Sequence, residues 1–320
     1  MEKIKTPDTD MNINTNAAAA DPRFTIEGCL DSDKEAIARP TITYAQDAWR
    51  RLKKNPVAMI SLAVLVLMVL MALLGPVLCG QDYIAMDPVN KNQPPSAEHW
   101  FGTDLLGRDL FARVCYGARV SLLIAVVCTL VQIVVGSAYG GIMAFFGGWV
   151  DDIMMRIIEI MRSLPYLLVV ILVMMVLGNN IPSLLIALCV TSWCNTARAI
   201  RGVVLQLKNA EYIMAARTLG ASPGRIISRH LIPNTIGILI LNIATSLPNY
   251  IFQESTLGFL GIGLESPNTS LGVLISLGQA SMEFYPLQLL FPALVLVLIV
   301  LSFNLLGDGL RDALDPRLRK

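Results

Sequence analysis

Four polar side chains recur along one apolar stretch of the chain, and their types and spacing suit the passage of a polar solute. They are Asn242, Ser246, Asn249 and Gln253. Successive members are three or four positions apart, so a helix places them all on one face. Amide and hydroxyl groups are costly in lipid unless they meet water or another polar group. The stripe predicts the lining of a translocation pathway, and hydrogen bonding between helices is the alternative.

A second group of residues, in the polar segment 209–233, suits docking to another protein. Its sequence, NAEYIMAARTLGASPGRIISRHLIP, predicts two short helices around a glycine turn. Asn209 can cap the first helix, and Glu211 lies in its opening turn, where a carboxylate favours the helix dipole. Gly220 ends that helix because glycine tolerates the left-handed conformation, and Ser222 begins the second. The segment is too short to be an enzyme, so we interpret it as a docking element.

Binding of this basic segment to anionic lipid is the alternative to protein docking. The basic side chains are interleaved with small residues, which suit close contact with a protein. The small residues are Ala210, Ala215, Ala216 and Gly220. The segment also lacks the Trp and Phe anchors of a lipid-bound helix. These features favour docking to a protein.

The composition indicates a membrane protein and excludes several functions. Of the 320 residues, 54% are hydrophobic and 15% are charged, which is too apolar for an ordinary soluble domain. A net charge of +1 provides no field that would attract nucleic acid. The chain has no GxxxxGKS or GxxxxGKT motif, and His99 and His230 have no metal-ligand partner at helical spacing. We expect no catalytic residue, no metal and no cofactor bound by this chain.

Six apolar stretches are long enough, or nearly so, to cross a hydrocarbon layer of roughly 30 Å. They cover residues 57–79, 118–145, 164–178, 181–201, 233–253 and 288–307. The third stretch is the shortest, and we expect Pro165 to kink a helix that starts near Ile157. The sequence predicts an all-α, polytopic membrane protein with six transmembrane helices.

Lysines and arginines in the connecting segments predict the orientation, since such residues concentrate on the cytoplasmic side. The expected inner segments carry Arg50, Arg51, Lys53, Lys54, Arg156, Arg162, the basic residues of 198–229, Arg311, Arg317, Arg319 and Lys320. The outer segment 254–287 has no lysine or arginine. We therefore expect an N-in, C-in topology, with the docking segment in the cytoplasm.

Three segments outside the spans have their own predictions. Residues 102–119 predict a helix along the outer surface that begins near Thr103 or Asp104. Residues 271–283 are apolar but too short to span, which indicates an interfacial or re-entrant helix. Residues 1 to about 40 are polar and predict a mobile tail.

Small residues in the second span predict close helix packing. Gly136, Gly140 and Ala144 are four residues apart, which allows another helix to approach. The sequence does not decide whether Cys79 and Cys115, near the two ends of the outer connection, form a disulfide.

The docking segment resembles the EAA signature of ABC-importer permeases. That signature consists of a glutamate, paired alanines, a glycine and an apolar residue before proline, and the matching residues are Glu211, Ala215, Ala216, Gly220 and Pro233. In the family this loop forms the coupling helix, which sits in a cleft of the ATP-hydrolysing subunit. The resemblance implies that Glu211 and the alanines, together with Gly220, couple this chain to an ATPase.

The resemblance covers nearly the whole chain from about residue 24. DAWRRLKKNPVAMISL, HWFGTDLLGRDLFARVCYGARVSL and FQESTLGFLGIGLESPNTSLG look like the C-type permease of dipeptide, oligopeptide and nickel importers, and the N-terminal extension is most similar to oligopeptide members. It implies the type I ABC-importer permease fold. The expected organisation is a largely mobile cytoplasmic segment 1–56, a first transmembrane helix 57–79, an extracytoplasmic connection 80–117, a five-helix core 118–307 containing the coupling loop 202–232, and a cytoplasmic tail 308–320.

The resemblance also implies partners and a location in the bacterial inner membrane. The partners are a homologous B-type permease, two ABC ATPase subunits that bind ATP and Mg²⁺, an extracytoplasmic peptide-binding protein and a peptide cargo, with no nucleic acid. Import of nickel or another small solute is an alternative within the family. An ion-gradient-driven carrier is an alternative of another class, but it would need mid-membrane carboxylates, which are few apart from Glu254.

Overall fold

The computed structural model describes residues 44–314, and this part of the chain is mostly helical. The predicted mobile tail 1–40 and the last six residues, 315–320, lie outside the described residues. The helical elements are α1 (Tyr44–Leu52), α2 (Pro56–Cys79), α3 (Leu110–Phe146), α4 (Gly148–Ser163), α5 (Tyr166–Leu177), α6 (Ile181–Leu207), α7 (Glu211–Thr218), α8 (Pro223–Ile226), the π-helical turn η1 (Ile227–Leu231), α9 (Ile232–Asn234), α10 (Ile236–Phe259), α11 (Leu271–Ala280) and α12 (Pro286–Leu314).

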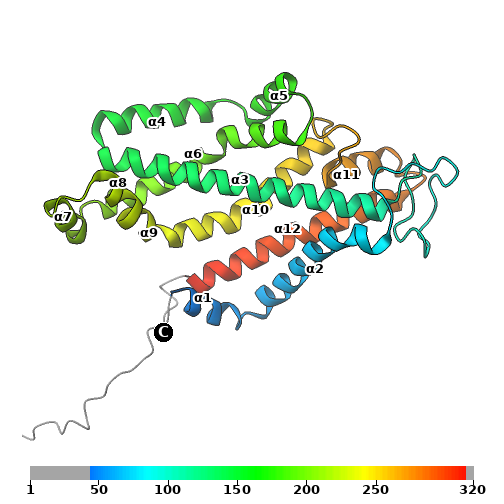
Figure 1. Ribbon diagram of the computed structural model, residues 1–320, viewed down its shortest axis with the longest axis horizontal. Helices are drawn as coiled ribbons and strands as arrows, with labels where there is room; N and C mark the ends of the chain where they lie inside the picture. Colours follow the sequence, from blue (N-terminus) through cyan, green and yellow to red (C-terminus); the bar gives the residue numbers. More distant parts are fainter. Residues whose placement is uncertain (1–43, 315–320) are drawn as a thin grey trace, which may run out of the picture. The chain divides into compact units, whose positions relative to one another are not determined.

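The long helices run back and forth between two ends of the bundle (Figure 1). One end holds α7 and α8, the turn between α3 and α4, the start of α2 and the last turn of α12. The other end holds residues 80–109 and α11. This arrangement places the docking segment at the same end of the bundle as both ends of the described chain, as an N-in, C-in orientation requires.

Five helices, α2, α3, α6, α10 and α12, are long and apolar enough to cross a membrane, and α4 with α5 forms a sixth candidate span that is bent by 83°. The expected helix start near Ile157 is wrong, since the helix starts at Gly148. A sharp bend does lie at Pro165, but it is a break between two helices, because α4 ends at Ser163 and α5 begins at Tyr166. Leu164 is extended, with ψ of 133°, because the residue before proline avoids the helical conformation, and the ring of Pro165 ends the helix instead of bending it.

The outer connection does not form the predicted surface helix over 102–119. The helix begins only at Leu110, where the Asp109 carboxylate caps it, and it continues into the second span as α3. Gly102 and Gly107 have φ of +78° and +75°, which interrupt a right-handed helix. The glycines, which allow a tight turn, decide the local structure here.

Asp104 holds this turn together. Its carboxylate accepts hydrogen bonds from the backbone N–H of Leu106 at 2.8 Å and of Arg108 at 2.9 Å, and it pairs with the Arg108 and Arg113 guanidinium groups. Burial raises the pKa of Asp104, but the two backbone donors and the two arginines outweigh it, so the pKa lies below its usual value. The turn that leads into α3 is thus fixed by charge.

The disulfide left open between Cys79 and Cys115 does not form, since both are free thiols. Cys115 is fully buried, and a Cβ added at Gly75 of α2 would overlap its sulfur. Cys115 therefore serves as a small packing residue where α2 crosses α3.

The predicted close packing through Gly136, Gly140 and Ala144 is confirmed. A Cβ at Gly136 would lie 2.8 Å from Cβ of Thr196, and one at Gly140 would overlap the carbonyl oxygen of Ala197, both on α6. Ala144 is fully buried near the end of α3. Backbones this close fix α3 and α6 as one unit.

Candidate functional site

The docking segment has the predicted form of a helix, a glycine turn and a helix. α7 covers Glu211–Thr218, and Gly220 has φ of +79°, which ends it. The cap at Asn209 is wrong, because Ala210 occupies the N-cap position. The loop also begins later than residue 202, since α6 continues to Leu207. The longer α6 is stabilised by the apolar cluster that the docking segment makes with it.

This cluster attaches the docking segment to the ends of α3 and α6. Its buried members include Ala144 of α3, Ile200 and Val204 of α6, Ile213 of α7, Ile226 of α8 and Leu231 of η1. Lys208 Nζ donates a hydrogen bond to the Ala144 carbonyl at 3.1 Å. The guanidinium carbon of Arg217 lies 4.8 Å from the centroid of the Phe145 ring. Buried apolar contacts therefore attach α7 to the ends of α3 and α6.

The other face of the docking segment is open. Glu211, Ala215 and Gly220 are exposed and Ala216 is half-buried. Large apolar side chains accompany them, with exposed fractions of 44% for Tyr212, 51% for Met214 and 87% for Leu219. Apolar side chains gathered on so short a segment are typical of a contact surface for another protein.

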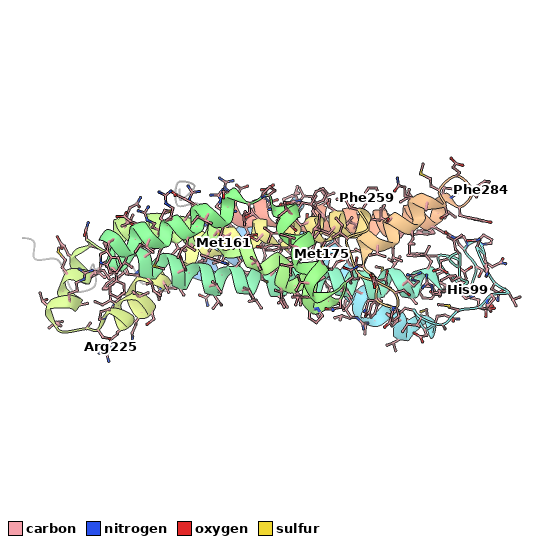
Figure 2. All side chains as sticks on the ribbon, turned by 90° about the horizontal axis from the view of Figure 1, so that it is seen from above. His99, Met161, Met175, Arg225, Phe259 and Phe284 are labelled. Atoms are coloured by element: carbon pink, nitrogen blue, oxygen red, sulfur yellow. The ribbon has the colours of Figure 1, made fainter. Side chains whose placement is uncertain are left out.

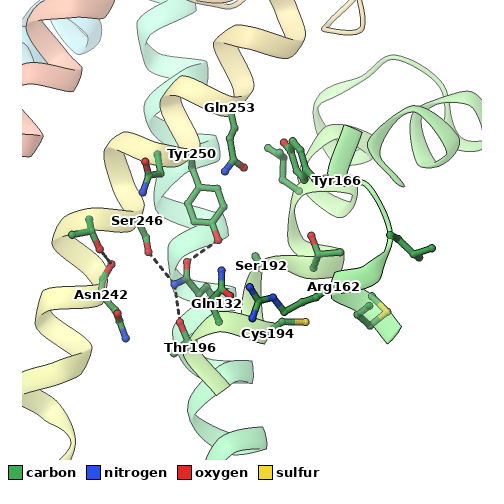
Figure 3. A pocket seen from close by; sticks show the side chains of 17 residues that line it. Gln132, Arg162, Tyr166, Ser192, Cys194, Thr196, Asn242, Ser246, Tyr250 and Gln253 are labelled. Atoms are coloured by element: carbon green, nitrogen blue, oxygen red, sulfur yellow. Dashed lines mark hydrogen bonds between the residues drawn. The ribbon is translucent and has the colours of Figure 1, made fainter. Parts of the chain in front are cut away.

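The predicted stripe on α10 lines a cavity of about 420 Å³ (Figure 3). All four predicted residues, Asn242, Ser246, Asn249 and Gln253, are among its lining. The opposite wall comes from the end of α4, the start of α5 and the middle of α6, including Arg162, Tyr166, Ser192 and Asn195. The cavity is therefore lined largely by neutral groups that can both donate and accept hydrogen bonds.

Gln132 of α3 connects three helices beside this cavity. Its Nε2 donates to Thr196 Oγ1 of α6 at 2.7 Å and to Ser246 Oγ of α10 at 2.9 Å, and Tyr250 Oη donates to its Oε1 at 2.7 Å (Figure 3). Ser246 therefore joins helices as well as lining the cavity. Asn249, in contrast, is exposed to the cavity.

The wall formed by α4 is tied to α6 by an ion pair. Arg201 Nε donates to Asp151 Oδ1 at 2.6 Å, and Arg201 Nη2 donates to Asp151 Oδ2 at 2.5 Å, a bidentate geometry. The prediction that Arg162 lies in an inner connecting segment is wrong. Arg162 lies at the break between α4 and α5 and lines the cavity, because α4 begins earlier than the sequence predicts.

Several residues of these sites were not singled out from the sequence. Gln132 carries a readable signal, since an amide in an apolar span needs a polar partner. The sequence gives no such indication for Ile213 and Leu219. Which apolar residue of this short segment is buried and which is exposed depends on where α3 and α6 end. The role of Arg162 depends on where α4 begins.

Two family models match the chain. The model described as the binding-protein-dependent transport system inner membrane component matches residues 132–320. The model described as the N-terminal TM domain of oligopeptide transport permease C matches residues 43–95. Together they cover both the cavity-forming helices and the helices α1 and α2 that precede them.

Curated relatives match over nearly their whole length. The dipeptide transport system permease protein DppC of Bacillus subtilis (strain 168) is 46% identical over 301 residues, which is 94% of this chain and 94% of the relative. The oligopeptide transport system permease protein OppC of Escherichia coli (strain K12) is 44% identical over 274 residues, covering 85% of this chain and 91% of the relative.

The fold is also found among solved structures. A chain of the inward-facing MetNI methionine ABC transporter superposes with a TM-score of 0.51 at 19% identity, covering 63% of this chain and 96% of that chain. At this identity the likeness concerns the fold alone.

Proposed function

The chain belongs to the family of binding-protein-dependent transport system inner membrane components, and on this premise we propose that it is the C-type permease subunit of an ATP-driven peptide importer. It forms half of the translocation pathway, and a homologous B-type permease forms the other half. Two ATPase subunits, which bind ATP and Mg²⁺, dock on the cytoplasmic side, and an extracytoplasmic binding protein delivers the peptide. Relatives named for dipeptide and for oligopeptide transport match with similar identity, so the cargo is a short peptide.

The observation that carries the proposal is the mechanical connection between the docking segment and the cavity. Ile213 fixes α7 to the ends of α3 and α6, and the same two helices bear Gln132 and Thr196 beside the cavity. When the ATPase subunits close, α7 is displaced, and α3 and α6 move with it as a rigid body. Rigid-body rocking of this kind converts a displacement at one site into a change of access at another.

The cavity supplies the chemistry that a peptide needs in the membrane. Each peptide bond presents a donor and an acceptor, and both must be paired when they leave water. Asn249 and Gln253 offer both types of group. The neutral polar wall therefore suits a peptide backbone irrespective of its side chains.

An ion-gradient-driven carrier is supported less well. Glu254, the carboxylate that such a carrier would use, is fully buried and accepts a hydrogen bond from Ser121 Oγ at 2.6 Å. It is not among the residues that line the cavity. The family match and the position of Glu254 both favour drive from a separate ATPase.

Replacing Leu219 by aspartate tests the docking. The side chain is 87% exposed, so the change leaves the fold of this chain intact while it puts a charge at the centre of the proposed contact. We expect co-purification of the ATPase subunits to be lost and peptide uptake by reconstituted complex to fall by about thirtyfold or more, as for a contact worth at least ~2 kcal/mol. Leu219→Met is the matched control and retains both. ATPase binding and uptake at the wild-type level in Leu219→Asp would contradict the proposal.

A further inference from the structure

The cavity contains a cation, Arg162. Among the described residues that line the cavity, it is the one charged side chain. Within the described part of the chain, no group forms an ion pair or hydrogen bond with its guanidinium. Nearby arginines differ: Arg156 pairs with Glu159 at 3.0 Å, and Arg201 pairs with Asp151 at 2.5 Å. Arg162 alone among these three is left with its donors unused.

Arg162 lies in the last turn of α4, and Met161, its neighbour in the chain, is set inward from the end of the bundle where Arg225 lies (Figure 2). Charged side chains within the apolar helices of a membrane protein face a water-filled cavity or bind a partner of opposite charge. The side chain of Arg162 points toward the cavity (Figure 3).

Two further polar groups of the cavity have no hydrogen-bond partner among the residues that the structure describes. They are Tyr166 Oη and Asn242 Nδ2, which are both buried and belong to residues that line the cavity. A hydroxyl and an amide nitrogen can each donate a hydrogen bond. A positive charge together with unused donors matches a ligand that is anionic and accepts hydrogen bonds.

We propose that Arg162 binds the C-terminal carboxylate of a peptide as the peptide crosses the cavity. This inference rests on the proposed function, because it takes a peptide as the cargo. The α-carboxyl group has a pKa of about 3.3–3.7, so every peptide with a free C-terminus carries this charge at neutral pH. The guanidinium offers two parallel N–H donors that match a carboxylate. Arg162 thus gives the cavity a fixed orientation for a cargo whose side chains vary.

The test compares two cargoes in the complete importer reconstituted into proteoliposomes: trialanine with a free C-terminus, and trialanine amide, which lacks the charge. Their affinities for the binding protein are measured separately, and each is supplied at saturation. We expect the wild type to take up the free acid about tenfold faster than the amide, as one charge-assisted interaction implies. In Arg162→Gln the rate for the acid falls to that of the amide, whose own rate does not change, and Arg162→Lys restores part of the preference. Arg156→Gln, on the same helix but away from the cavity lining, keeps the wild-type ratio.

The other outcomes overturn the inference. An unchanged ratio in Arg162→Gln means that the guanidinium does not contact the carboxylate. An equal loss for both cargoes, or loss of the partner permease during purification, means that Arg162 has a structural role or pairs with an acid of that subunit. If the wild type takes up neither cargo although both bind the binding protein, the proposed peptide import fails, a result distinct from failure of the Arg162 assignment.

Discussion

Replacing Gly140 by leucine is expected to prevent α3 and α6 from packing, and so to abolish folding of the chain. A Cβ at this position overlaps the Ala197 carbonyl oxygen, which belongs to the backbone of α6 and cannot rotate away. Overpacking by a whole side chain in a tight contact costs 1–3 kcal/mol or more, and separation of α3 from α6 would also expose the Gln132 hydrogen bonds. The measurement is the yield of monodisperse protein in detergent, with its thermal unfolding temperature.

Gly202→Leu is the matched control for this change. Gly202 lies in α6, the helix that Gly140 of α3 contacts, but a Cβ added at Gly202 meets no atom within 4 Å. The same substitution is therefore accommodated, and a better helix former stabilises the helix by up to ~1 kcal/mol. Equal yields of Gly140→Leu and Gly202→Leu would contradict the close contact between α3 and α6.

The second large effect is expected from Ile213→Asp, which places a carboxylate in the cluster that attaches α7 to α3 and α6. Ile213 is fully buried, and an unpaired charge there costs several kcal/mol, so α7 separates from the cluster while its outer face remains available. We expect the ATPase subunits still to bind and hydrolyse ATP, but peptide uptake to fall by about a hundredfold, because displacement of α7 no longer reaches the cavity. ATP hydrolysis and uptake are measured on the same proteoliposomes.

Ile213→Val serves as its control. It keeps an apolar side chain, costs about 0.5–1.5 kcal/mol and should preserve the ratio of uptake to hydrolysis. Uptake and hydrolysis that fall together in Ile213→Asp would indicate that the cluster is required for docking and does not transmit motion.

The sequence is sufficient to predict the helices whose signals are local. Length and hydropathy predict the spans that became α2, α3, α6, α10 and α12, and Gly220 predicts the end of α7. The periodicity of Asn242 and Gln253 predicts a shared face, and the cavity lies along that face. In each case the physical cause acts within a few residues of the chain.

Features that depend on distant contacts were not predictable. The turn that replaces the expected helix in 102–119 depends on Gly102 and Gly107, whose backbones pack against the carbonyl groups of Gln93 and Asp87 only in the folded chain. The continuation of α6 to Leu207 depends on apolar residues of α7 and α8, which meet it only in the folded chain. The location of Arg162 depends on α4 extending back to Gly148 and packing on α6 through Asp151.

The central claim is that force from the ATPase subunits enters through α7 and reaches the cavity as a rigid displacement. Distances between spin labels in the reconstituted complex test this claim most directly. One pair, at Thr218 and Gln206, spans the joint between α7 and α6, and both sites are exposed. A second pair joins Thr218 to the corresponding position of the partner permease. With ATP bound, the account predicts an unchanged distance for the first pair and a clear change for the second. A first-pair distance that changes as much as the second would contradict it, because α7 would then bend at the joint instead of moving α6.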